Sequence, residues 1–144
     1  MEKNKKLIPG LPTGFEDRWD KRLYLKKKLL SLIEENFIRY GFEPLETPSF
    51  EISENIGSFL ADDDSNPMSN VFTFSEGEKN ITLRYDLSSP LARFVAQNNQ
   101  QLPLPYKRYA IQNVFRNEKA GNARYREFTQ ADCDIVGNVN QAQS

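Results

Sequence analysis

The chain has 144 residues, a formal net charge of −1, and 38% hydrophobic and 12% aromatic residues. This size and composition predict one folded domain and argue against an intrinsically disordered chain. The near-zero charge gives no global support for nucleic-acid binding, so such a partner would need a local basic patch. Because the sequence contains no histidine, general-base catalysis and metal ligation by histidine are excluded for this chain.

The cysteine content and the absence of long apolar runs bear on the compartment. Cys133 is the single cysteine and cannot form an internal disulfide, which favours a reducing compartment. No apolar run reaches the length of a membrane span, and the first residues, MEKNKK, lack the apolar core of a signal peptide. We therefore expect a cytoplasmic protein that does not act at a membrane.

The first third of the chain predicts an irregular segment followed by one long helix. Residues 1–15 contain two glycines and two prolines, which are typical of irregular structure. From Asp17 to Tyr40 the apolar residues recur at helical spacing. These residues are Trp19, Leu23, Leu25, Leu29, Leu30, Leu32, Ile33, Phe37 and Tyr40. We interpret the basic run 26–28 as a solvent-exposed helix face and Gly41 as a C-cap glycine.

The middle of the chain predicts short extended segments separated by a polar connection. Phe42–Phe50 contains two prolines, which suit an edge or interface strand better than a central one. Residues 61–70 form the polar connection, and their acidic triplet lacks the alternating spacing of an EF-hand calcium loop. Val71–Phe74 and Ile81–Tyr85 then predict a pair of strands.

A helix and a long hairpin complete the predicted fold. Ser88 or Ser89 can cap a helix that has Pro90 in its first turn. Tyr106–Glu118 and Arg124–Gly137 predict the two long strands of a β-hairpin. This order of elements predicts the α+β class, with an antiparallel sheet and flanking helices in a single domain.

The second hairpin strand concentrates the candidate binding residues. Side chains alternate along a strand, so the even-numbered residues after the loop are expected on one face. They are Arg124, Arg126, Phe128, Gln130, Asp132 and Asp134. A row of cations, a ring, an amide and acids is typical of a binding surface rather than of an ordinary half-buried strand. Cys133 falls on the opposite face, and we interpret it as a core residue.

Two interpretations of the hairpin arginines are open at this level. The Walker phosphate loop and the glycine-rich dinucleotide motif are absent, so side chains would have to hold any bound ATP. Arg116 and Arg124 flank the loop and can clamp phosphate oxygens through paired hydrogen bonds, while Phe128 can cover a base. The other interpretation is a surface hairpin with cross-strand Arg–Glu pairs, each contributing well under about 1 kcal/mol.

The acidic residues also have two interpretations. Asp86 directly precedes a predicted helix, where a carboxylate commonly serves as a turn or helix-terminal group. Asp132 and Asp134 would need cationic or hydrogen-bonding partners if they were buried. A ligand with an ammonium group or with N–H groups would supply such partners.

Several segments resemble a known family. VFRNE, a short loop and ARYREF closely resemble motif 2 of class II aminoacyl-tRNA synthetases. LRYDLSSPLARFVAQN and QADCDIVG are similar to the histidyl-tRNA synthetase family, in the subgroup with Asp instead of Glu at two positions. GFEPLETPSFE resembles motif 1, and PGLPTGFEDR resembles the N-terminal segment of that family. The resemblance covers nearly the whole chain, with motif 1 at about 30–50 and motif 2 at about 112–137.

The resemblance implies a role for each matching residue. Arg116 is implied to be the catalytic arginine, which holds both the ATP α-phosphate and the histidine carboxylate. The implied ATP-binding residues are Arg116, Glu118 near the adenine amino group, Arg124 near the outer phosphates and Phe128 stacked on adenine. The implied histidine-binding residues are Asp86, Leu87, Ser88, Arg116, Gln130 and Asp134. The loop 117–123 is implied to approach the tRNA acceptor stem.

The activity that the resemblance implies is histidine–tRNA ligation. Histidine and ATP would form histidyl-adenylate and pyrophosphate, and the histidyl group would pass to the 3′ end of tRNA(His). ATP would be used with Mg2+, for which the sequence indicates no ligands, and motif 1 would form a homodimer. A histidine-sensing regulatory subunit of ATP phosphoribosyltransferase is the alternative, which has less need of an ATP clamp. A free-standing RNA- or partner-binding piece is a third, with little support from the net charge.

The sequence departs from the family pattern at some positions. Asp86, Ser88 and Asp134 are smaller than the Glu, Thr and Glu of many members, and Ala123 replaces a usual glycine. Motif 3 with its second ATP arginine, the histidine-specific arginine segment and the anticodon-binding domain do not occur before Ser144. We therefore expect an N-terminal part of the enzyme, which does not complete the active site alone.

Overall fold

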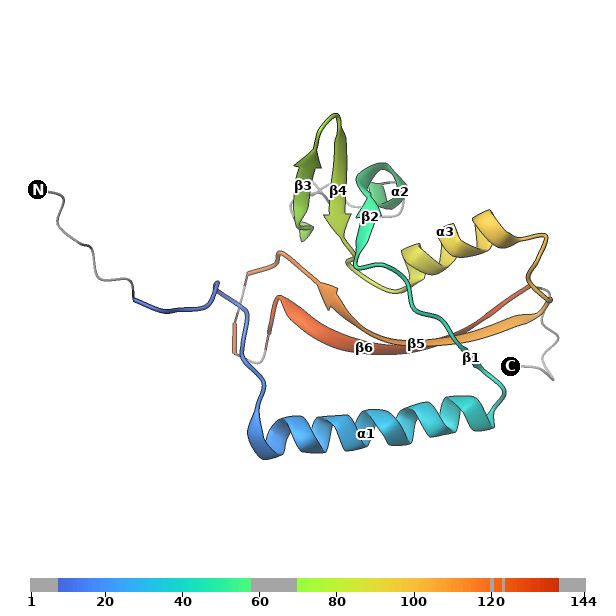
Figure 1. Cartoon of the computed structure of the whole chain (residues 1–144), viewed down its shortest axis with the longest axis horizontal. Coiled ribbons are helices and arrows are strands. Elements are labelled where there is room, and N and C mark those ends of the chain that lie inside the picture. Colours follow the sequence, from blue (N-terminus) through green and yellow to red (C-terminus); the bar gives the residue numbers. More distant parts are fainter. Residues whose placement is uncertain (1–7, 58–69, 120, 123, 138–144) are drawn as a thin grey trace, which may run out of the picture.

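The computed structural model describes residues 8–57, 70–119, 121, 122 and 124–137. Figure 1 shows helix α1 along one face of a long hairpin, with helix α3 and a smaller sheet on the other side. The predicted α+β fold is confirmed. In chain order the elements are α1 (Asp20–Arg39), β1 (Glu43–Pro44), β2 (Phe50–Ile52), α2 (Ser53–Gly57), β3 (Thr73–Glu76), β4 (Lys79–Leu83), α3 (Ser88–Asn98), β5 (Tyr106–Phe115) and β6 (Glu127–Val136).

The strands form two three-stranded sheets, in the orders β1-β5-β6 and β2-β4-β3. The larger sheet combines the predicted antiparallel hairpin with one parallel edge strand, because Glu43 of β1 lies opposite Arg108 of β5. The chain between these strands includes the smaller sheet and α3, a long crossover of the kind that parallel strands require. The proline-containing segment Phe42–Phe50 divides between β1 and the start of β2, and both strands lie at sheet edges as predicted.

The C-terminus of α1 confirms the prediction of a C-cap glycine. Gly41 has φ +77°, a left-handed conformation that glycine adopts without a steric penalty. Its N–H donates to the Ile38 carbonyl at 2.9 Å, and the N–H of Phe42 donates to the Phe37 carbonyl at 3.0 Å. The rings of Phe37 and Phe42 also lie in contact, with centroids 6.2 Å apart. These are the hydrogen bonds and the apolar contact of a Schellman motif, which directs the chain into β1.

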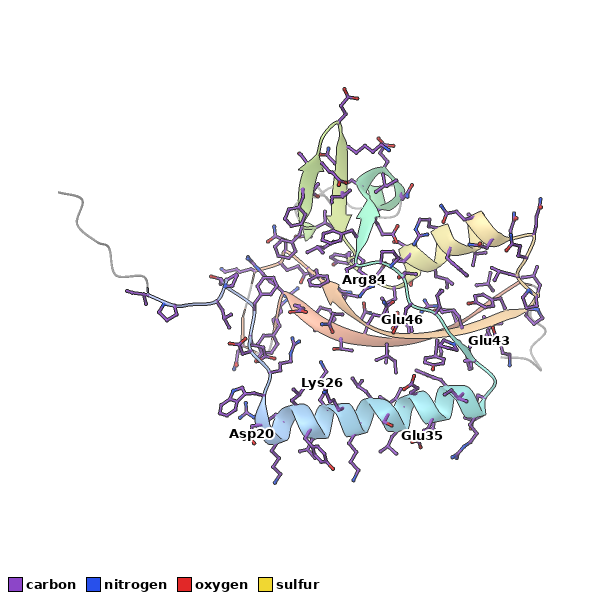
Figure 2. The ribbon with its side chains drawn as sticks, in the orientation of Figure 1. Asp20, Lys26, Glu35, Glu43, Glu46 and Arg84 are labelled. Carbon is purple, nitrogen blue, oxygen red and sulfur yellow. The ribbon has the colours of Figure 1, made fainter. Side chains whose placement is uncertain are left out.

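The inner face of α1 differs from the predicted apolar stripe. Trp19 and Tyr40 are each 73% exposed, and Lys26 occupies an inner position instead. The half-buried positions 23, 26, 30, 33 and 37 follow steps of three and four. Lys26 Nζ donates to Thr129 Oγ1 on β6 at 2.6 Å, and Figure 2 shows Lys26 on the side of α1 that faces the hairpin. The prediction of a solvent-exposed basic run is therefore wrong for Lys26, because helical spacing places it against the sheet.

The β5–β6 hairpin confirms the predicted long strands but ends them earlier. The strands pair from Tyr106 with Val136 to Phe115 with Glu127. Position 124 and position 126 therefore lie in the loop, and only residues 128–134 of the predicted row alternate as strand residues. The face that carries Phe128 also buries the core cluster of the molecule. That cluster consists of Leu87, Ala110 and Val114, with Phe128 packed against it.

Cys133 lies on the opposite face of β6 as predicted, but its interpretation as a core residue is wrong. It is exposed. At this level α1 contacts the neighbouring strand instead, because Glu34 and Phe37 both reach Tyr109 on β5, the residue that pairs with Cys133. β6 is the edge strand, so its side chain here is left without a covering helix residue.

The smaller sheet and α3 begin at slightly different residues from those predicted. β3 is displaced from Val71–Phe74 to Thr73–Glu76, and the acidic triplet of the connection 61–70 lies outside the described residues. Pro90 lies in the first turn of α3 as predicted. A serine cap is not formed, because Leu87 is the N-cap residue and the Asp86 carboxylate accepts the Ser89 N–H at 3.1 Å. Among the described residues, none of the helices is long and apolar enough to cross a membrane.

Arg84 joins the two sheets, at the point where β4 ends beside the hairpin (Figure 2). Its guanidinium is buried, and Nε donates to the Asn113 carbonyl of β5 at 2.6 Å. Nη1 donates to the Thr47 carbonyl before β2 at 2.7 Å. Burial lowers the pKa of Arg84, while Glu46 and Glu51 oppose that shift. The two carbonyls replace the solvation that the buried cation loses, so Arg84 positions the segment that leads into α3.

Candidate functional site

Arg116 lies directly after β5 and is held between two aromatic rings. Its guanidinium carbon is 4.4 Å from the ring centroid of Tyr85 and 5.1 Å from that of Phe128. Its backbone N–H donates to the Arg126 carbonyl at 2.8 Å, which extends the hairpin pairing into the loop. Cation–π contact with two rings restricts the orientation of a long flexible side chain. The structure therefore presents a cation in a defined position at the loop end of the hairpin.

Glu118 contacts both Tyr85, which lies beside Arg116, and Arg124 of the loop. Its Oε1 accepts a hydrogen bond from the Tyr85 hydroxyl at 2.9 Å, and its Oε2 accepts one from Arg124 Nε at 3.0 Å. The hydrogen bonds from Arg124 and then Tyr85 lower the pKa of Glu118. The Arg–Glu pair expected for a simple surface hairpin is thus formed, between two of the four residues that the resemblance assigns to ATP. Arg124 is 66% exposed, so it remains accessible to an anion.

The pH dependence of this contact has a definite sign. A carboxylate with a lowered folded-state pKa stabilises the fold above its unfolded pKa, ordinarily 4.5 here, and loses that contribution as pH falls through the folded value. We expect Glu118→Gln to lower the free energy of unfolding at pH 7 by under about 1 kcal/mol, since solvent screens an exposed pair. Urea unfolding at pH 7 and pH 3 measures this change in the free energy of unfolding. Glu78→Gln in the β3–β4 turn is the control. A loss that persists undiminished at pH 3 would contradict it.

The four residues implied to bind ATP line one cavity of about 240 Å³. They are Arg116, Glu118, Arg124 and Phe128, and Tyr125 joins them. The cavity is smaller than the roughly 300–1,000 Å³ of most ligand sites, so these residues form one part of a nucleotide site. Tyr85 was not found from the sequence, although it contacts both Arg116 and Glu118. The only signal for it was its position next to Asp86.

A larger cavity of about 610 Å³ lies between the start of α1, the segment before it and the hairpin. Its charged residues have both signs, and Arg18 and Lys26 contact other lining residues or the hairpin. Arg18 Nε lies 3.0 Å from Glu16 Oε1, and Arg18 Nη2 donates to the Glu127 carbonyl. Burial, followed by repulsion from Arg18, lowers the pKa of Lys26 in this cavity. These pairs join the segment before α1 to the back of β6, which is a structural role.

The residues implied to bind histidine lie farther along the hairpin face. Gln130 and Asp134 come from β6, and Leu87 is buried at the start of α3. Burial raises the pKa of Asp132 between them, and the charges of Asp134 and Asp86 raise it further. The start of α3 faces the hairpin, because the Leu87 carbonyl accepts a hydrogen bond from Arg108 Nη2 on β5 at 3.0 Å. Ser88 is exposed at that start.

Arg108 on β5 is the residue that sequence reasoning missed in this acidic group. Its side chain is fully buried, and Nη2 lies 2.6 Å from Asp134 Oδ2 and donates to the Leu87 carbonyl at 3.0 Å. The 2.6 Å contact is an ion pair by distance without hydrogen-bond alignment, because Asp134 Oδ2 accepts no aligned bond among the described residues. Counting the hairpin register from the loop would have placed Arg108 opposite Asp134.

The predicted site residues thus form two neighbouring groups on one face of the hairpin. The loop group contains Arg116, Glu118, Arg124 and Phe128. The second group contains Asp86, Leu87, Gln130 and Asp134, with Ser88 at its margin. Phe128 lines the cavity of about 240 Å³ and also packs against the core cluster, so it lies between the two groups. The loop 117–123 includes positions 120 and 123, which are outside the described residues.

The fold is that of a class II aminoacyl-tRNA synthetase core. The family model for the class II core domain of tRNA synthetases (F) matches residues 17–143. The chain therefore belongs to this family.

Within the family, the chain is similar to histidine–tRNA ligases. It is 78% identical to the histidine–tRNA ligase of Pelagibacter ubique over 144 residues, which is all of this chain and 31% of the relative. It is 44% identical to that of Rhodopseudomonas palustris over 142 residues, 98% of this chain and 27% of the relative. The chain thus spans less than one third of the length of these curated relatives.

Solved structures agree with this placement. The histidyl-tRNA synthetase of Nostoc sp. PCC 7120 superposes with a TM-score of 0.75 at 30% identity, over 91% of this chain and 29% of that one. A protein of Bacillus halodurans described as an ATP phosphoribosyltransferase regulatory subunit/histidyl-tRNA synthetase superposes with a TM-score of 0.77 at 25% identity. That match covers 93% of this chain and 34% of the other.

Proposed function

We propose that this chain forms the part of a histidine–tRNA ligase that binds ATP and histidine. The observation that carries the proposal is the position of Arg116. Its guanidinium lines the loop cavity and stands on the same hairpin face as Gln130 and Asp134. One cation at the boundary of the two groups is suited to contact two anionic reactants, a phosphate and a carboxylate. The 78% identity to a ligase over the whole chain supports this assignment.

The proposed chemistry is attack of the histidine carboxylate on the α-phosphorus of ATP. The new bond forms between a carboxylate oxygen and this phosphorus, and pyrophosphate leaves. A terminal ribose hydroxyl of tRNA(His) then attacks the acyl carbon, and AMP leaves. Such transfers depend on positioning and on neutralising phosphate charge. Arg116 would hold the α-phosphate and the carboxylate together, so it is the catalytic residue of this proposal.

The other loop residues would hold the nucleotide. Arg124 would exchange its contact with Glu118 for the outer phosphates, because a phosphate offers more charge than one carboxylate. The released Glu118 would accept a hydrogen bond from the adenine amino group, and Phe128 would stack on the adenine ring. Mg2+ would enter with ATP as part of the substrate. Within the described part of the chain, no three acidic or sulfur side chains lie together as metal ligands.

Histidine would bind in the acidic group. Carboxylates accept hydrogen bonds from ammonium and imidazole N–H groups, which suits Asp86 and Asp134. Gln130 Oε1 is buried and has no hydrogen-bond partner among the described residues, so a substrate N–H would satisfy it. Ser88 would add a hydroxyl and Leu87 the apolar floor. The same chemistry fits a histidine-sensing regulatory subunit, but the cavity around Arg116 favours the ligase because a sensor has less need of an ATP clamp.

The remaining partners follow from the motif positions. We place motif 1 at about 30–50, from the second half of α1 to β2, and motif 2 at about 112–137. A homodimer through motif 1 would cover apolar side chains of α1 that are exposed in the chain, including Leu32 and Ile38. The loop 117–123 would approach the tRNA acceptor stem. We place the enzyme in the cytoplasm, where tRNA is charged for protein synthesis.

The test is a chimera in which this chain replaces the matching 144 residues of the Pelagibacter ubique ligase. We expect it to catalyse histidine-dependent exchange of pyrophosphate into ATP and to charge tRNA(His), because every implied site residue is retained. Exchange measured with histidine and with each of the other amino acids gives the specificity. A folded chimera that binds histidine but exchanges no pyrophosphate would instead support the regulatory-subunit function.

A further inference from the structure

Arg108 is a buried cation that none of the proposed steps uses. It comes from the middle strand of the larger sheet and is 0% exposed. A buried guanidinium is strongly unfavourable unless acids or hydrogen-bond acceptors surround it. Among the described residues, its Nε and Nη1 have no hydrogen-bond partner. The same is true of Gln130 Oε1, on the same hairpin face.

The single nitrogen of Arg108 that has partners connects two walls of the acidic group. Nη2 donates to the Leu87 carbonyl at 3.0 Å, at the start of α3, and lies 2.6 Å from Asp134 Oδ2 on β6. The Asp134 side chain is otherwise 39% exposed. Arg108 therefore holds one carboxylate oxygen of Asp134 from inside the protein, which leaves the rest of that carboxylate open to a ligand.

The charges around Arg108 favour a cationic ligand. Asp86 and Asp134 belong to the second group, and Asp132 lies between Gln130 and Asp134 on β6, where the charges of both other acids affect its pKa. Burial raises it most, Asp134 and Asp86 raise it further, and Arg108 lowers it. Arg108 is paired with Asp134, and the carboxyl groups of Asp86 and Asp132 add negative charge beside this pair. Without Arg108 the three acids would repel one another with no internal counter-charge.

We propose that Arg108 is a positioning residue that orients Asp134 for the amino-acid substrate and ties it to the start of α3. This inference rests on the proposed ligase function and deepens it. Asp134 is one methylene shorter than the glutamate of many family members, so it reaches less far from its strand. The ion pair holds the Asp134 side chain in one rotamer, with the rest of its carboxylate open to the substrate. The substrate then meets a preorganised hydrogen-bond acceptor.

The test measures the KM values for histidine and ATP separately, by pyrophosphate exchange in the chimera. We expect Arg108→Met to raise the KM for histidine about 10- to 100-fold, the usual effect of leaving a buried charged group without its partner. The KM for ATP is expected to stay within about twofold, because ATP is bound by the other group. Lys107→Met is the matched control on the opposite face of β5, where its cation lies over the Phe42 ring at 5.6 Å.

The pair is tested by combining substitutions. If Arg108 acts through Asp134, the histidine KM of Arg108→Met/Asp134→Asn equals that of Asp134→Asn alone, whereas independent effects multiply. Arg108→Lys keeps the charge but not the planar guanidinium that places Nη2 within reach of both partners, so a KM between those of the parent and Arg108→Met is expected. Arg108→Lys also provides the test of the positioning role if Arg108→Met does not fold.

The outcomes separate this inference from the function on which it rests. A parent chimera without histidine-dependent exchange overturns the proposed ligase function. An active parent whose Arg108 variants lose only kcat or thermal stability, with an unchanged histidine KM, overturns the positioning role. Multiplicative effects in the double variant overturn the action through Asp134.

Discussion

Arg116→Ala is expected to lower histidine-dependent pyrophosphate exchange in the chimera by about 10²- to 10³-fold. Removing one preorganised charge or hydrogen-bond donor from a reacting oxyanion has an effect of this size. Substitution of Arg116 should reduce exchange more than substitution of the other hairpin arginines. Its guanidinium is oriented by Tyr85 and Phe128, because the guanidinium carbon lies 4.4 and 5.1 Å from their ring centroids. The loss should appear in kcat as well as in the KM values, since the contact strengthens as charge develops at the α-phosphorus.

Two further variants make this result specific. Arg116→Lys keeps a positive charge without the planar fork, so we expect it to recover only a small part of the exchange rate. Arg22→Ala is the control, because Arg22 lines the larger cavity and not the cavity around Arg116. Normal exchange by Arg116→Ala together with a large loss in Arg22→Ala would move the nucleotide to the larger cavity and refute the assignment.

Arg93→Ala is expected to lower the free energy of unfolding of this chain by about 3–5 kcal/mol, the effect of breaking one half of a buried ion pair. Arg93 on α3 meets Glu51 on β2 through two hydrogen bonds, Nε to Oε2 at 2.6 Å and Nη2 to Oε1 at 2.8 Å. The Glu51 side chain is only 4% exposed, so its charge would be left buried without a partner. Urea unfolding followed by far-UV circular dichroism measures the change.

Replacing both partners separates the lost pair from the stranded charge. Glu51→Met/Arg93→Met should be more stable than Arg93→Ala, because no charge remains buried. Glu16→Ala is the control for a partly exposed pair, and its effect should be under about 1 kcal/mol since Glu16 is 36% exposed beside Arg18. Equal losses in Glu16→Ala and Arg93→Ala would show that burial does not determine the strength of these pairs.

Local patterns were sufficient for the long elements of this fold. Helical spacing predicted α1 and Gly41 predicted its end, because a left-handed residue is needed there. Alternation predicted the β5–β6 hairpin and put Phe128, Gln130 and Asp134 on one face. The loop end of the hairpin was predicted less well, because regular pairing stops at Phe115 and Glu127. Beyond that point side-chain direction no longer follows period two.

Two predictions made from residue type were wrong, because tertiary packing places these side chains differently. Lys26 looked like a solvated lysine, but its helical position faces β6 and Thr129 supplies a hydrogen bond. Cys133 looked like a core residue, but it lies on an edge strand that α1 does not cover at this level. In both cases the missing information was which neighbouring element covers the side chain.

The sequence by itself determined the class of protein and one wall of the candidate site, because motif 2 is contiguous in the chain and strand alternation orients its residues. Only the tertiary structure decided what faces that wall. The contact of Tyr85 with Arg116 and that of the Leu87 carbonyl with Arg108 join segments that are not paired in the hairpin. Local periodicity carries no information about such contacts, which depend on how the start of α3 packs on the hairpin over the Leu87, Ala110 and Val114 core.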